Sequence, residues 1–89
     1  MIHIKDRRGL IRRLSRVGGQ VKGISKMVAE DRYCIDILTQ ISAAKSALNK
    51  VGMIIVGDHM DSCVTSAIKG GKGEESIKEL MEVMNRFVK

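Results

Sequence analysis

The sequence contains no proline and no tryptophan, and its only aromatic residues are Tyr33 and Phe87. Large aromatic side chains usually anchor a compact core, so a chain of 89 residues with only two of them has little with which to build a core of its own. The apolar residues are aliphatic instead, and together with the absence of proline they favour long helices. Thin helical units commonly complete their core by oligomerising. We therefore expect one domain, residues 1–89, that works as an oligomer.

Long apolar runs are also missing. No segment approaches the ~20 apolar residues that a membrane-spanning helix needs. The N-terminal sequence MIHIKDRRG lacks the continuous apolar stretch of a secretory signal. These absences predict a cytoplasmic protein with no membrane partner. In a reducing compartment, the two cysteines fit metal ligands or reactive thiols better than a structural disulfide.

Positive charge is concentrated at the N-terminal end. Residues 1–26 carry eight Lys and Arg side chains against one acid, Asp6, whereas the remainder carries eight basic and nine acidic side chains. This distribution predicts a polyanionic partner, DNA or RNA ahead of an anionic membrane, because the segment lacks the Trp and Phe anchors of a membrane-surface helix. A solvated basic helix face is the alternative that composition leaves open.

Apolar spacing predicts three helices, over about 5–28, 32–68 and 74–88, and no strand. Asp31 is the expected N-cap of the second helix, and the glycine-rich stretch 69–73 is the expected stop before the third. The seam of the first helix alternates steps of four and three through Leu10, Leu14, Val17, Val21, Ile24 and Val28. Such a narrow seam suits packing against another helix.

Cys34, His59 and Cys63 form the most informative constellation. His59 and Cys63 are four residues apart and Cys34 precedes His59 by 25, so all three lie on one stripe of a continuous helix. Along that helix Cys34 and His59 are about 37 Å apart, too far to bind one ion. Two copies packed antiparallel would instead bring Cys34 of one protomer beside His59 and Cys63 of the other, giving two equivalent metal sites per dimer.

Two thiolates and one imidazole make a soft ligand set with few donors, which suits a trigonal Cu(I) site. Zn(II) normally takes a fourth ligand, which Asp58, Asp61 or water could supply. The spacing alone also leaves a structural role open, because free cysteines are often buried as small apolar groups and a lone histidine is often only hydrogen-bonded.

Three stretches of the chain resemble the copper-sensing repressor family (CsoR-like, alongside the nickel/cobalt and formaldehyde sensors). They are GGQVKGI (18–24), EDRYCIDILTQISA (30–43) and DHMDSC (58–63), and the likeness covers nearly the whole chain. The resemblance implies an all-α fold: a three-helix protomer, an antiparallel four-helix-bundle dimer and a dimer of dimers. It also implies a repressor rather than an enzyme. The metal-free protein would bind double-stranded operator DNA without a conventional helix-turn-helix and release it when Cu(I) binds.

The resemblance also assigns roles to residues. Cys34 matches the family's bridging thiolate, and His59 and Cys63 match the pair donated by the other protomer. Tyr33 and Glu79 match positions beside the metal site in copper sensors. Because Glu79 lies on the third predicted helix, metal binding could shift how that helix packs.

Arg13 and Lys50 match basic positions that the family uses for operator binding. The full set of candidates for phosphate contacts is Lys5, Arg7, Arg8, Arg12, Arg13, Arg16 and Lys50. Binding through such contacts would weaken steeply with salt, because each phosphate contact releases counterions.

Position 63 discriminates between branches of the family. Nickel/cobalt sensors resemble this chain but have histidine there, formaldehyde sensors lack the second cysteine, and persulfide sensors lack the histidine. Cys34, His59 and Cys63 together therefore follow the copper pattern. His3 is a departure that could add a ligand and favour Ni(II), Co(II) or Zn(II), and a solvent-exposed histidine in a frayed N-terminus is the other interpretation.

Two other classes of function compete with a metal sensor. Cys34, near Arg32 and near His59 of another chain, could be a reactive thiolate in a thiol or formaldehyde sensor or in a detoxifying enzyme. No oxyanion hole or general-acid set accompanies it, so we predict no enzyme. A structural oligomer without a ligand is the second rival, and chelation of metal would not change its DNA binding.

Overall fold

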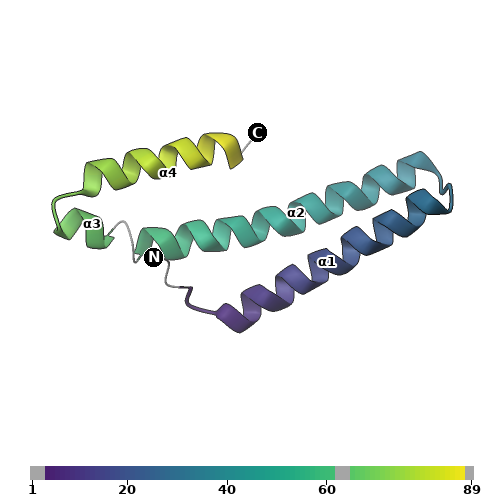
Figure 1. Cartoon of the computed structure of the whole chain (residues 1–89), viewed down its shortest axis with the longest axis horizontal. Helices are drawn as coiled ribbons and strands as arrows, with labels where there is room; N and C mark the ends of the chain where they lie inside the picture. The colour runs from purple at the N-terminus through teal and green to yellow at the C-terminus, as the bar shows by residue number, and fades with distance from the viewer. Residues whose placement is uncertain (1–3, 62–64, 88–89) are drawn as a thin grey trace. The chain divides into compact units, whose positions relative to one another are not determined.

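The computed structural model describes residues 4–61 and 65–87. The helices in this part are α1 (Arg7–Ala29), α2 (Cys34–His59), α3 (Thr65–Lys69) and α4 (Gly73–Phe87), as Figure 1 shows. The described residues include no strand, which confirms the predicted all-α class. The chain divides into a hairpin unit, Asp6–Ile54, and a terminal unit that joins residues 1–5 to residues 55–89. None of the described helices is both long and apolar enough to cross a membrane.

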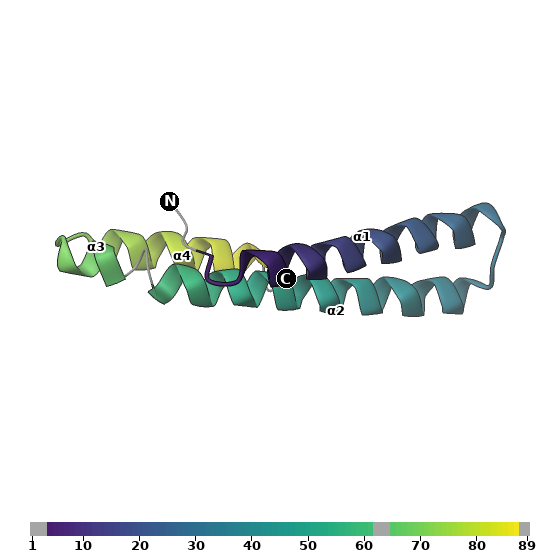
Figure 2. The ribbon, with the colours of Figure 1, turned by 90° about the horizontal axis from the view of Figure 1, so that it is seen from below.

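The hairpin unit is built from α1 and the first part of α2, which run side by side in opposite directions (Figures 1 and 2). Its buried apolar residues are Leu10, Val17, Ala44 and Val51. Other large apolar side chains on the same two helices stay exposed, among them Ile11, Leu14, Val21, Leu38 and Leu48. The core of the hairpin is therefore as thin as the shortage of aromatic residues predicts.

The helix α1 ends in a Schellman motif. The amide of Arg32 donates to the carbonyl of Met27 at 3.0 Å, and the amide of Asp31 donates to the carbonyl of Val28 at 3.2 Å. Asp31 adopts a left-handed conformation with φ of 53°. The prediction that Asp31 caps the start of the second helix is therefore wrong, because this residue completes the end of the first. Asp tolerates the left-handed region better than most residues, so the same side chain suits either position.

Two helices, α2 and α3, are described within the stretch predicted as one helix over 32–68. α2 ends at His59 and α3 begins at Thr65, with residues 62–64 outside the described part. The hydroxyl of Thr65 donates to the main-chain carbonyl of Met60 at 3.0 Å. Threonine hydroxyls compete with helical N–H groups for such carbonyls. Residues 34–61 and 65–69 are helical, so most of the predicted stretch is helix, and the part of the prediction at 62–64 lies outside the described residues.

In the terminal unit, α3 and α4 are in contact across the turn at Gly70–Gly71. The amide of Lys72 donates to the carbonyl of Ala67, and that of Gly71 to the carbonyl of Ile68, which again is the Schellman pattern. Gly71 has φ of 80°, a conformation that residues with a Cβ rarely adopt. The glycine-rich stretch therefore ends the helix as its sequence predicts.

Replacing Gly71 by alanine is expected to lower the free energy of unfolding by about 1 kcal/mol, because a Cβ strains the left-handed conformation. Urea unfolding followed by circular dichroism at fixed protein concentration measures the change. Gly70→Ala is the matched control: φ at Gly70 is not positive, and an added Cβ would lie 3.5 and 3.8 Å from the carbonyl oxygens of Ser66 and Ala67, an ordinary contact. Equal losses in the two variants would contradict the assignment.

Candidate metal centre and basic surface

Cys34 and His59 are the first and last residues of α2. The thiol of Cys34 is free and exposed, and His59 is half-buried. At about 1.5 Å of rise per residue, a continuous helix separates two positions 25 residues apart by about 37 Å. One chain therefore cannot bring this thiol and this imidazole to the same ion.

Two of the predicted ligands, Cys63 and His3, lie outside the described residues. Among residues 4–61 and 65–87, no group of three or more His, Cys, Asp or Glu side chains is arranged to hold a metal ion. Tyr33, predicted to lie beside the metal, directly precedes Cys34 and is 66% exposed. Its carbonyl accepts the amide of Ile37 at 3.2 Å, so the backbone at Tyr33 is fixed by the first turn of α2.

His59 shares a small, mainly apolar hollow with Glu79 of α4. This histidine hollow has a volume of about 180 Å³ and is lined by Ile55, Val56, His59, Glu79, Leu80 and Val83. The apolar face of α4 and the last turn of α2 thus bring the predicted pair His59 and Glu79 to one place. A carboxylate beside an imidazole can orient the ring and stabilise its N–H, which is the usual arrangement around a metal-binding histidine.

Lys5 is held by two aspartates that flank His59. Its amide donates to a carboxylate oxygen of Asp58 at 3.3 Å, and its ammonium forms an ion pair with Asp61. Asp58 is buried, at 7% exposure, whereas both members of the ion pair are largely exposed. The hydrogen bond to Asp61 and the charge of that carboxylate raise the pKa of Lys5, with a smaller contribution from Asp58.

Only opposite charge hints at this pairing in the sequence, because Lys5 and Asp61 are 56 residues apart. Its consequence is that two residues considered for other roles already have partners. The ammonium of Lys5, a candidate for phosphate contact, faces a carboxylate. Asp61, a candidate fourth ligand for Zn(II), accepts from that ammonium. The arginines of α1 are therefore better candidates for binding DNA than Lys5.

The basic candidates of α1 are exposed along the helix, as is Lys50 on α2. Arg12, Arg13 and Arg16 line a solvent-open hollow of about 270 Å³ together with Asp6 and Gly9, and we call it the arginine hollow. Guanidinium groups bind phosphate oxygens through paired N–H donors. The structure thus gathers three of the predicted DNA-binding residues in one place, and Lys50 is not among the residues that line it.

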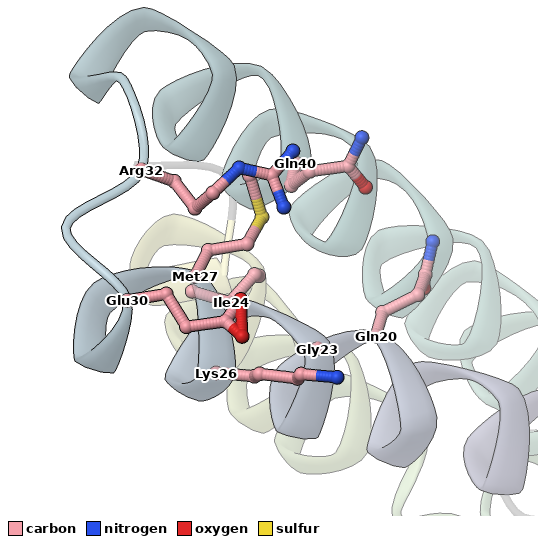
Figure 3. Close-up of a pocket in the computed structure, with 8 residues that line it drawn as sticks. All are labelled: Gln20, Gly23, Ile24, Lys26, Met27, Glu30, Arg32 and Gln40. Carbon is pink, nitrogen blue, oxygen red and sulfur yellow. The ribbon is translucent and has the colours of Figure 1, made fainter.

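A second polar hollow, of about 310 Å³, lies where α1 and α2 meet the turn between them (Figure 3). It is lined by Gln20, Gly23, Ile24, Lys26, Met27, Glu30, Arg32 and Gln40. Figure 3 shows Arg32 reaching from the turn over Met27 toward Gln40. Neither Cys34 nor His59 is among the residues that line this hollow.

Comparison with known proteins identifies the relatives of this chain. A model of the metal-sensitive transcriptional repressor family matches residues 6–86. The copper-sensing transcriptional repressor CsoR of Bacillus subtilis (strain 168) is 47% identical over 85 residues, covering 96% of this chain and 84% of that protein. The copper-sensing transcriptional repressor RicR of Mycobacterium tuberculosis (strain ATCC 25618 / H37Rv) is 46% identical over 80 residues, covering 88% and 83%.

Solved structures agree with these sequence matches. The copper-sensing repressor CsoR with Cu(I) from Geobacillus thermodenitrificans NG80-2 superimposes with a TM-score of 0.88 at 47% identity, covering 100% of this chain and 94% of that one. The nickel-responsive transcriptional regulator InrS superimposes with a TM-score of 0.77 at 38% identity, covering 96% of each chain. The fold and these matches define a regulator of transcription rather than an enzyme. More particularly, the chain belongs to the metal-sensitive transcriptional repressor family, which confirms the resemblance seen in the sequence.

Proposed function

We propose that residues 1–89 form a single Cu(I)-responsive repressor domain that acts in the cytoplasm. The metal-free oligomer binds double-stranded operator DNA, and Cu(I) releases it. The observation that carries this proposal is the likeness, over nearly the whole chain, to copper-sensing repressors at 47% identity in sequence and to a Cu(I)-bound repressor at a TM-score of 0.88.

Cu(I) is held between protomers in this proposal, by Cys34 of one and by His59 and Cys63 of the other. The positions of Cys34 and His59 at the two ends of α2 support this arrangement, because a shared ion then requires a second chain. Sulfur donors suit Cu(I), and three donors are enough for its low coordination number. Tyr33 adjoins the thiol, and Glu79 shares the hollow of the imidazole.

The exposed apolar surface of the hairpin unit also supports packing against a second copy of the chain. An apolar hollow of about 320 Å³ is lined by Val17, Val21 and Ile24 of α1 and by Ile41, Ala44, Lys45 and Leu48 of α2. Burying such side chains contributes about 25 cal/mol for each Å² of apolar surface removed from water. This surface supports a homo-oligomer, a dimer or a dimer of dimers, in which α1–α2 hairpins pack against one another.

DNA binding is assigned to the basic face of α1 together with α2. Arg13 and Lys50 are the preferred contacts, with Arg8, Arg12 and Arg16 as further ones, and all are exposed. These residues would contact phosphates and so position the protein on the duplex, whereas base contacts would supply sequence discrimination. The concentration of positive charge in residues 1–26 supports this assignment.

Release of DNA requires that Cu(I) favour the conformation with lower DNA affinity. Linking Cys34 to His59 and Cys63 across the dimer would draw the ends of α2 from two chains together. Glu79 in the histidine hollow offers a route by which this change reaches α4. Linkage makes the effect reciprocal, so bound DNA weakens Cu(I) binding by the same factor.

A sensor of Ni(II), Co(II) or Zn(II), or of thiols or formaldehyde, is the alternative within the same family. The likeness to the nickel-responsive regulator InrS, at 38% identity, favours the nickel version of this alternative. It would recruit His3 as an added ligand. The copper proposal is supported by a higher identity, 47%, and by a cysteine at position 63.

Anaerobic titration of the protein–DNA complex with Cu(I), Ni(II) and Zn(II) tests the choice of metal. The probe is a labelled duplex that the metal-free protein selects from a random pool, followed by fluorescence anisotropy. Cu(I) is expected to weaken binding about 5- to 150-fold, the usual range of allosteric coupling. Cys34→Ala should remove the response and His3→Ala should keep it. Release by Ni(II) alone, with a requirement for His3, would move the protein to the nickel branch.

Mixing two inactive variants tests whether the site lies between protomers. Cys34→Ala and His59→Ala should each lose high-affinity Cu(I) binding when measured against a competing chelator. In a mixed dimer one site regains all its ligands and the other loses two, because the site is two-fold symmetric. Random exchange of subunits should therefore restore about a quarter of the wild-type sites. No recovery, despite subunit exchange verified by mass spectrometry, would argue for a site within one chain.

The salt dependence of DNA binding tests the basic residues. Arg13→Ala and Lys50→Ala should each weaken DNA binding. Each should also reduce the slope of the logarithm of the DNA association constant against log salt, by about 1 for each phosphate that the assembly no longer neutralises. The control is Lys78→Ala, which removes an exposed positive charge from α4. A slope that changes equally in all three variants would show that only net charge matters.

A further inference from the structure

Asp6 places a negative charge among the arginines that are proposed to bind DNA. It is the N-cap of α1, and its carboxylate accepts the amide of Gly9 at 3.0 Å. The carboxylate lies so close to the first turn of α1 that a methyl group added at Gly9 would overlap it. Asp6 also lines the arginine hollow, and it is the one acid in residues 1–26.

Within the described residues, the ion pair that forms is that of Lys5 with Asp61. The three guanidinium groups of the arginine hollow make no ion pair within 4 Å there. They are exposed and stand around an opening of about 270 Å³. Unpaired guanidiniums of this kind can take a phosphate through paired hydrogen bonds. The nearby carboxylate of Asp6 lowers the positive potential at the same opening, because unlike charges at short range partly cancel.

Capping does not itself require that charge. Asparagine and serine cap helices about as well as aspartate, because each offers a side-chain oxygen to the first amides. A neutral cap would leave the start of α1 intact and the hollow more positive. The negative charge of Asp6 therefore lowers the positive potential of the arginine hollow, an effect that is separate from its role as the N-cap of α1.

We propose that Asp6 is an internal competitor for a DNA backbone phosphate in the arginine hollow, and that it limits the sequence-independent affinity of the protein for DNA. This inference rests on the proposed DNA-binding function. Sequence-independent affinity comes almost entirely from phosphate contacts. A repressor faces a vast excess of competing sites, so weaker binding to each of them favours occupancy of the operator.

The test measures binding of the metal-free, full-length protein to a labelled random duplex of about 30 base pairs, long enough to span several phosphate contacts on each strand. Asp6→Asn and Asp6→Ser remove the charge and keep a cap. Both should bind about three- to tenfold tighter at about 0.1 M salt, and the gain should shrink as salt screens the charge. Asp6→Glu keeps the charge and should stay within about twofold of the wild-type affinity.

Asp36→Asn is the matched control, because it neutralises an acid in the first turn of α2 that does not line the arginine hollow. Thermal melting of each variant checks that the fold is kept, and the two neutral caps guard against one that folds poorly. Unchanged affinity in both neutral-cap variants, or an equal gain in the Asp36→Asn control, would overturn the inference while the wild-type protein still binds DNA. A wild-type protein that binds no duplex would overturn the proposed function, and the inference with it.

Discussion

A single helix keeps Cys34 and His59, two candidate metal ligands, apart, and the proposed function depends on this separation. α2 begins at Cys34 and ends at His59, so about 37 Å of helix lies between these two residues at about 1.5 Å of rise per residue. An ion that needs both must recruit a second chain. In the proposed function assembly and sensing are therefore tied together, because α2 carries a candidate ligand at each end and exposes apolar residues that a second chain could cover.

The thin core of the hairpin unit also favours assembly with a second chain. The hairpin unit buries few apolar side chains and leaves many aliphatic residues exposed, and Tyr33, its one aromatic residue, is exposed too. A protomer that stabilises itself by packing against its partner is sensitive to small changes in that packing. Such sensitivity is useful in a sensor, since a captured ion has to alter only the interface to alter what the assembly binds.

The periodic parts of the fold could be predicted from the sequence, and the parts set by single side chains could not. The seam from Leu10 to Val28 corresponds to α1, and the glycine-rich stretch correctly predicted the turn at Gly71. Asp31 was misassigned because a short acidic side chain suits the end of one helix as well as the start of the next. The hydrogen bond from the Thr65 hydroxyl to the carbonyl of Met60 is likewise set by a single side chain and does not appear in the apolar spacing. The spacing of Cys34 and His59 predicted two distant positions on one helix, and both lie on α2. The ion pair between Lys5 and Asp61 depends instead on contacts that no local pattern encodes.

Tyr33 directly precedes the thiol of Cys34 and is largely exposed. It is the one tyrosine of a chain that has no tryptophan. Ultraviolet emission from this protein therefore originates beside one of its candidate ligands. Changes at that end of α2 can be followed by intrinsic tyrosine fluorescence, with no dye attached and no tryptophan emission to mask it.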